Sequence, residues 1–438
     1  MEEIVQWRYF MLKFPRLLLL LAACALVARA ADETAMNRLA ETYVKLALAA
    51  GVHDGDYVDA YSGPTEWRTA AEAAKLPLAD VRARIDALAK DLAKVDLAGF
   101  GAMERKRHAY LSKLVTALTT RLAIIAGEKV SFDEESRLIY DTVAPTKSAA
   151  GYDAALAELD RALPGPGTVA ERFQAFQNQF IIPPAKLDAV FQAAIAEARA
   201  RTLKRIPMPA HEKFTLEYVK NKPWGGYNWY QGNAHSVIQI NTDLPIFIDR
   251  AVDLAAHEGY PGHHVYGTLL EEKLLKGRGW IEFSVNPLFG PNGIIAEGSA
   301  NYGIDVAFPG AEKLKFEREV LYPLAGLDPA RAEEYDRIQE LKKKLSFAGN
   351  EAARRYLNGE ITADEAAAML VKYSLMEPAR AQKRVKFIEK YRTYVITYNH
   401  GQELVHDWVE QQAKGDKDKR WALFTELIST PQLPSGLK

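Results

Sequence analysis

The chain has 438 residues, of which 48% are hydrophobic, and it carries 56 basic and 57 acidic side chains. This length allows one large domain or two to three ordinary ones, and the apolar content is ample for a sizeable core. The balanced charge gives no support to nucleic-acid binding as the main role, so small or peptidic substrates stay open.

The first 30 residues have the pattern of an export signal. Lys13 and Arg16 precede an apolar run over 17–27, and a small-residue cleavage site follows at 28–30. The apolar run is too short to span a bilayer comfortably, so no membrane span is expected. Two glutamates near the N-terminus are unusual in such a signal, which makes Met11 an alternative start. The expected organisation is a signal peptide over 1–30 and a single periplasmic domain over 31–438.

The single cysteine, Cys24, lies inside this signal. The stretch 21–24, Leu-Ala-Ala-Cys, resembles a lipoprotein cleavage box, so a lipid anchor on Cys24 is the alternative to release after Ala30. Release is favoured because the apolar run continues past Cys24. Either way the folded part holds no disulfide, and its core must supply the stability.

Helical patterns dominate from residue 35 to about residue 200. Residues 38–46 place apolar side chains at helical spacing, and 81–97 repeat this pattern with strong helix formers. The run Pro-Gly-Pro-Gly at 164–167 breaks the chain. A further helix is expected to follow the proline pair at 183–184 and to run to about Thr202.

The pattern changes between residues 212 and 244. Residues 214–219 and 236–242 are candidate strands, separated by an aromatic, turn-rich stretch at 224–230. Residues 244–256 are expected to be helical and to lead directly into a histidine-rich run, and helix dominates again from 297 to about 426. The expected fold is therefore mainly α, one large helical domain with a small antiparallel β-sheet beside the histidine-rich helix.

The run 257–264, His-Glu-Gly-Tyr-Pro-Gly-His-His, has the residue types of a metal site. On a regular helix two histidines four positions apart can grip one ion, but Pro261 stands four positions after His257. A straight helix also places His263 and His264 poorly. Because Pro261 and Gly262 can bulge the helix and loop out two residues, they can bring His263 to the second ligand position. His264 is the alternative ligand.

The chemistry of these residues predicts a catalytic zinc site. His257 and His263 supply neutral imidazoles, and Glu297, from another helix, supplies an anionic third ligand. Three protein ligands leave the fourth position of Zn²⁺ for water. Glu258 directly follows the first ligand and can take a proton from that water as general base.

Together with Glu-Gly-Ser-Ala-Asn-Tyr at 297–302, this run resembles the bacterial domain-of-unknown-function 885 family. The family motif is close to H-E-x-x-P-G-H-H followed by E-G-x-A-x-Y, and Ser299 stands where the family more often has Trp. The resemblance covers roughly residues 35–415. That family is similar to the helical gluzincin peptidases, such as the carboxypeptidase Taq and angiotensin-converting-enzyme groups. The resemblance implies peptidase chemistry, a mostly helical fold with a deep channel, and His263 in the ligand position.

A metallopeptidase also needs a donor for the oxyanion of its tetrahedral intermediate. Tyr394, Tyr398 and His400 are the candidates, and the alternative is that the two tyrosines pack in the core near a helix end. Asn233 and His235 lead into an expected edge strand, where they can contact a substrate main chain or simply form a polar loop cluster.

The substrate's free carboxylate has only weak candidate partners, which are Arg392, Arg380, Lys383 and Arg384. The sequence thus predicts an exported zinc-dependent metallopeptidase that cleaves short peptides. One alternative is a non-catalytic helical binding protein with a vestigial metal site, against which the intact Glu258 argues. The other is a zinc hydrolase of non-peptide amides or esters, which uses the same residues.

Overall fold

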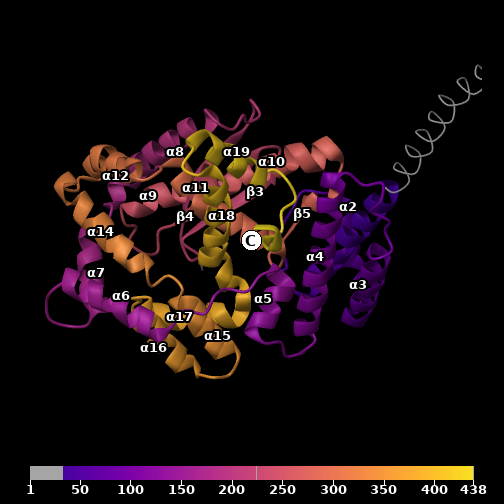
Figure 1. Cartoon of the computed structure of the whole chain (residues 1–438), viewed down its shortest axis with the longest axis horizontal. Helices are drawn as coiled ribbons and strands as arrows, with labels where there is room; N and C mark the ends of the chain where they lie inside the picture. The colour runs from indigo at the N-terminus through magenta and orange to yellow at the C-terminus, as the bar shows by residue number, and fades with distance from the viewer. Residues whose placement is uncertain (1–32, 223, 438) are drawn as a thin grey trace, which may run out of the picture.

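The computed structural model describes residues 33–222 and 224–437 (Figure 1). The expected signal over 1–30, including Cys24, lies outside the described residues. The described part is mainly helical with a small sheet, which confirms the expected fold class. None of its helices is both long and apolar enough to cross a membrane.

One hydrophobic core joins the N-terminal helices to three helices from late in the chain. Residues 33–53 are helical, and β1 (Val58–Tyr61) follows. The remaining helices of this core pack around Leu111, Leu118 and Ile388; they are α2 (Thr65–Ala74), α3 (Leu78–Leu92), α4 (Ala102–Ile125), α5 (Phe132–Tyr140), α15 (Ala348–Leu357), α16 (Ala363–Tyr373) and α17 (Pro378–Tyr391). The helix expected over 81–97 therefore ends five positions early, at Leu92.

A second core holds most of the remaining helices. Its aromatic centre includes Phe180, Tyr322 and Tyr335. The helices are α6 (Ala149–Ala162), α7 (Val169–Gln177), α8 (Leu187–Leu203), α9 (Asp249–Leu254), α10 (His263–Leu270), α12 (Ala311–Phe316), α13 (Tyr322–Ala325), α14 (Ala332–Lys343) and α19 (Lys417–Leu427). The chain breaks at 164–167 between α6 and α7, as the Pro-Gly run predicted.

Two central helices, α11 (Pro291–Ala307) and α18 (Ile396–Ala413), contribute to both cores. They lie against each other in the middle of the molecule (Figure 1). At their crossing, a Cβ on Gly298 would lie 2.4 Å from the carbonyl oxygen of Gly401, so only glycine permits this approach. The crossing sets the positions of side chains one turn away on both helices.

The larger sheet has three strands in the order β2 (Lys213–Val219), β4 (His235–Asn241), β3 (Gly226–Gly232). Both expected strands are present, but the sheet is mixed, because β2 runs parallel to β4 and only β3 is antiparallel. Residues 226–230, expected to be turn-rich, belong to the edge strand β3, since their aromatic side chains favour extended structure. The hairpin turn between β3 and β4 holds Asn233 and Ala234, both with φ of 52°.

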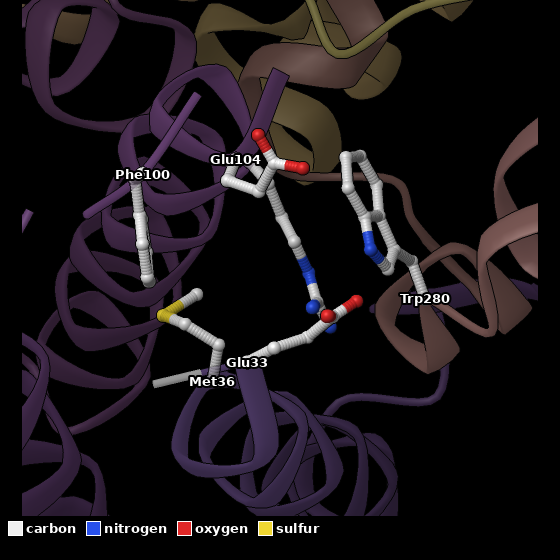
Figure 2. A pocket seen from close by; sticks show the side chains of 6 residues that line it. Glu33, Met36, Phe100, Glu104 and Trp280 are labelled. Carbon is white, nitrogen blue, oxygen red and sulfur yellow. The ribbon is translucent and has the colours of Figure 1, made fainter. Parts of the chain in front are cut away.

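A two-stranded antiparallel sheet pairs β1 with β5 (Val285–Pro287). Beside it, the buried guanidinium of Arg107 donates from Nε to Glu282 Oε1 at 2.6 Å and from Nη2 to Glu282 Oε2 at 2.9 Å. Figure 2 shows the pocket next to this pair, with Phe100 and Trp280 on opposite sides. Its volume of about 10 Å³ is room for about one water molecule, so this pocket is structural.

Candidate metal centre

The helix that carries the first histidine ends in a wide turn. α9 continues as a π-helical turn over Ala255–Gly259, and Tyr260 then turns extended before α10 begins at His263. The interruption expected at Pro261 and Gly262 is present, but it separates two helices instead of bulging one. π-Helical turns often occur at functional sites because they redirect side chains.

Gly262 lets the chain fold back onto the preceding turn. A Cβ on this residue would lie 1.9 Å from the carbonyl oxygen of His257, a distance no side chain can tolerate. Its amide donates to the carbonyl oxygen of Ala256 at 2.9 Å. The result is that His263, the first residue of α10, lies beside His257.

Three side chains from α10, α11 and the π-helical turn converge on one point. His257 Nε2 lies 3.1 Å from His263 Nε2 and 3.4 Å from Glu297 Oε2. His263 Nε2 lies 3.8 Å from Glu297 Oε1. One nitrogen or oxygen of each residue lies within 4.8 Å of the others, so this group could hold a metal ion.

Two neighbouring side chains orient this group. His257 Nδ1–H donates to Asn301 Oδ1 at 3.0 Å, and the Asn301 amide nitrogen donates to the carbonyl oxygen of Tyr398 at 3.1 Å. With this proton on Nδ1, the neutral ring that a metal requires presents its Nε2 lone pair toward the cluster. On the other side, the Tyr394 hydroxyl donates to Glu297 Oε1 at 2.9 Å.

The donor set fits a zinc ion. Glu297 Oε2 is buried and makes no hydrogen bond among the described residues, although buried carboxylate oxygens are normally satisfied. Two imidazole nitrogens and this oxygen are the ligand types of catalytic zinc sites. A cation at this point would satisfy all three.

The charges of the cluster are strongly coupled. Burial lowers the pKa of His263 to about 4, with the nearby His257 adding to the effect. Burial would also lower the pKa of His257, but Glu258 and Glu297 outweigh it and raise that pKa to about 9. Burial favours a raised pKa for Glu297, yet its contacts with His257, His263 and Tyr394 hold the pKa below its usual value.

Glu258 lies next to the cluster but is not part of it. Burial raises the pKa of its carboxyl to about 7, opposed by His257. The carboxylate makes no hydrogen bond with another described residue, while the Glu258 carbonyl oxygen accepts from Asn228 Nδ2 at 2.6 Å. A Cβ on Gly226 of β3 would lie 3.0 Å from Glu258 Oε1, so the edge strand packs against this side chain.

His264, which the sequence offered as the alternative metal ligand, points away from the cluster. It is fully buried, with Nδ1 2.9 Å from Ser236 Oγ and Nε2 3.0 Å from Glu212 Oε2. Glu212 also accepts from Tyr260 at 2.6 Å and pairs with Arg199 at 2.5 Å. These bonds fix the first turn of α10 onto the sheet.

Of the expected oxyanion donors, the structure brings the two tyrosines to the cluster. Tyr394 and Tyr398 meet edge to face with ring centroids 5.6 Å apart. Burial raises the pKa of both hydroxyl groups, and the nearby Glu297 raises it further. His400 is buried with Nε2 3.0 Å from Thr142 Oγ1. Because it lies two positions after Tyr398, its side chain leaves α18 on nearly the opposite face.

The expected substrate-binding residues lie elsewhere. The Asn233 amide donates to Glu271 Oε1 at 2.9 Å in the hairpin turn, at the end of β3 remote from Gly226. His235 begins β4, which was expected to be an edge strand. Instead β4 is the central strand of the sheet, with β2 on one side and β3 on the other. Arg392 is engaged in an ion pair with Glu135 at 2.6 Å.

Sequence reasoning missed several side chains near the cluster. Asn301 follows Glu297 by one helical turn, a spacing that could have indicated it. Asp59 of β1 accepts from Tyr227 at 3.1 Å and Asn286 at 3.3 Å. Burial raises the pKa of Asp59, and Glu297 adds to this, although the side chain is exposed. Asp59 therefore lies close enough to Glu297 for the two charges to interact.

The chain matches no protein-family model and no curated protein sequence. Among solved structures, it is similar to "the putative lipoprotein from Colwellia psychrerythraea", with 15% identity, a TM-score of 0.51, and coverage of 85% of this chain and 71% of that one. This likeness shows a shared fold.

Two further solved structures are more distant. One is a "putative lipoprotein of unknown function from Shewanella oneidensis", with 14% identity, a TM-score of 0.42 and coverage of 85% and 74% of the two chains. The other is the M32 carboxypeptidase from Deinococcus radiodurans, with 14% identity, a TM-score of 0.35 and coverage of 92% and 95%. Because no family model matches, membership of the 885 family stays a prediction from the motif.

Proposed function

We propose that this protein is an exported, zinc-dependent metallopeptidase that cleaves short peptides. The observation that carries the proposal is the convergence of His257, His263 and Glu297. Beside them lies the Glu258 carboxylate, which makes no hydrogen bond with any other residue that the structure describes. A structural zinc site would instead be closed by a fourth protein ligand. Among the described residues only three such groups converge here.

In this proposal His257, His263 and Glu297 would hold Zn²⁺, which lowers the pKa of a bound water and polarises a carbonyl group. Asn301 holds His257 with its Nε2 lone pair toward the cluster, and Tyr394 holds Glu297. Glu258 accepts the proton of the attacking water and delivers it to the leaving amine.

Tyr398 is the proposed donor to the developing oxyanion. Tyr394 already donates to Glu297, which assigns it to positioning, and His400 faces Thr142. The free edge of β3 lies beside Glu258 through Gly226, so an extended peptide can pair its main chain with that edge. This moves the proposed substrate contact from Asn233 and His235 to β3.

The test is metal content and peptide cleavage for the parent and for Glu258→Gln. We expect about one zinc per chain in both proteins. The cleavage rate of the variant should be lower by roughly a hundredfold or more. Glu272→Gln is the matched control and should change neither, because Glu272 is a half-buried glutamate whose partners include Lys276. Cleavage that survives Glu258→Gln would refute the assigned base, and zinc-free active protein would refute the class.

A further inference from the structure

One exposed carboxylate beside the candidate metal centre lies at an irregular position of a strand. Asp59 is the extra residue of a bulge in β1, because Val58 pairs with Pro287 and Ala60 pairs with Asn286. It is the exposed residue of this strand, whose other three residues are half-buried. Bulges often redirect a side chain next to a functional site. The bulge therefore presents the Asp59 side chain to solvent.

Two hydrogen bonds from two different strands hold the Asp59 carboxylate. The Tyr227 hydroxyl of β3 donates to Oδ1 at 3.1 Å, and Nδ2 of Asn286 on β5 donates to Oδ2 at 3.3 Å. A carboxylate has about four lone-pair positions, so these two donors leave about half of them open. Because the side chain is exposed, a solute can reach the open positions.

On one side, β3 joins Asp59 to the proposed general base. Tyr227 directly follows Gly226, and a Cβ on Gly226 would lie 3.0 Å from Glu258 Oε1. β3 also contacts the π-helical turn that carries Glu258. One residue of the strand therefore packs against the base, and the next residue, about 3.8 Å along the backbone, holds Asp59.

On the other side, β5 joins Asp59 to a proposed metal ligand. Asn286 Oδ1 accepts from Nδ2 of Asn292 at 2.8 Å, and Asn292 lies on α11, the helix that also carries Glu297. α11 contacts β5 as well. Asp59 thus lies beside the cluster, within reach of a short peptide that is bound there.

The negative charge of Asp59 has no positive partner among the described residues. Asp54 and Asp56 lie on the same segment, and their carboxylates pair with Arg121 at 2.7 Å and with Lys390 at 2.8 Å. No lysine, arginine or histidine of the described part forms such a pair with Asp59. Burial raises the pKa of its carboxyl in spite of the two hydrogen bonds. A positively charged group of a ligand would supply the missing partner.

We propose that Asp59 binds a cationic nitrogen of the substrate and is a specificity-determining residue. The proposal rests on the proposed peptidase function and names its substrate class, which is short peptides with a positively charged amine near the cleaved bond. That amine is the free N-terminus or a lysine side chain, and a carboxylate recognises both through the same charge-assisted hydrogen bonds.

The experiment measures peptide binding by calorimetry to the Glu258→Gln protein with added zinc, which binds without cleaving. Three probes separate the two sources of the amine: tetra-alanine, N-acetyl-tetra-alanine, and the acetylated peptide with lysine at the second position. Each is measured with the Glu258→Gln background and with added Asp59→Asn, Asp59→Ser or Asp56→Asn. Asp59→Asn removes the charge and keeps the shape. Asp56 is the matched control, because Lys390 already compensates its charge.

We expect at least one cationic probe to bind roughly ten- to hundredfold more tightly than acetylated tetra-alanine, and Asp59→Asn to remove most of that preference. Asp56→Asn should retain it. Should Asp59→Asn fail to fold, Asp59→Ser decides in its place, because it also removes the charge. Equal binding of all three probes by the background protein, or a preference that survives the loss of the Asp59 charge, overturns the proposal.

Peptide cleavage by the parent protein is scored separately. Binding that depends on Asp59 without any cleavage would refute the proposed peptidase function and leave an amine-binding site. Cleavage together with a preference that ignores Asp59 would refute the role of Asp59 and leave the peptidase.

Discussion

The Nδ1–H group of His257 donates to Asn301 Oδ1 at 3.0 Å, and this bond decides which ring nitrogen faces the cluster. Asn301 in turn is held by the carbonyl oxygen of Tyr398 on α18. A side chain that never touches the proposed metal thus sets the tautomer and the orientation of one of its ligands.

Asn301→Leu should therefore weaken zinc binding by about ten- to hundredfold while all three proposed ligands remain. Competition with a chromogenic chelator measures the change. Ser299→Ala is the control on the same helix, because the Ser299 hydroxyl donates only to the Ala296 carbonyl oxygen. Equal zinc affinity in the parent and in Asn301→Leu would contradict the role assigned to the amide.

Gly226→Ala should slow cleavage without loss of zinc. The added methyl group would lie 3.0 Å from Glu258 Oε1 and 2.5 Å from Leu254 Cδ2, so the carboxylate must shift. A displacement near 1 Å costs about a hundredfold in rate, and roughly ten- to hundredfold is expected in kcat here. Gly225→Ala is the matched control, because no atom lies within 4 Å of its added Cβ. Equal kcat in the two variants would show that β3 does not position the base.

Substitutions of the two adjacent histidines should have different effects on zinc binding and on stability. His263→Ala should abolish zinc binding, whereas His264→Ala should keep zinc and destabilise the fold by about 1–3 kcal/mol, because Glu212 and Ser236 lose a buried partner. Zinc content and urea unfolding measure the two effects. Zinc lost from His264→Ala but kept by His263→Ala would reverse the assignment of the second ligand.

Glu212 should give the fold a pH-dependent contribution. Burial would raise the pKa of its carboxyl, but His264, Tyr260 and Arg199 outweigh it and lower that pKa to about 2. The stabilisation, on the order of 2–3 kcal/mol, is complete above the unfolded pKa near 4.5 and is lost as the pH falls toward 2.

Urea unfolding of the parent and of Glu212→Gln at pH 7, 5 and 3.5 tests this sign. The parent should be the more stable protein at pH 7 and 5, and the difference should shrink at pH 3.5. Glu217→Gln, on the exposed side of β2, should show no such trend. A difference that grows on acidification would contradict the lowered pKa.

The residues of the proposed metal site were predictable because local chemistry marks them. Pro261 and Gly262 signal the interruption that brings His263 beside His257, and the sequence correctly anticipated that rearrangement, though not the start of a new helix. The edge strand was missed because Gly225 and Gly226 resemble a turn. The pairing of β3 with β4 depends on tertiary packing, which the local sequence does not show.

Long-range packing could not be read from the chain. Asp59 accepts from Asn286 because β1 pairs with β5, which lies more than 200 positions later. Arg392 was a candidate because it is basic, yet its ion pair with Glu135 arises from the packing of α5.

The contact between Gly298 and Gly401 also has a consequence for how the protein is made. Glu297 lies next to Gly298, so the packing of α11 against α18 fixes the backbone that carries this carboxylate. A growing chain carries both histidines long before it carries the helix that fixes their carboxylate. We therefore expect a chain cut short before α18 to lack the packing that fixes Glu297, and so to be unable to form the proposed metal centre.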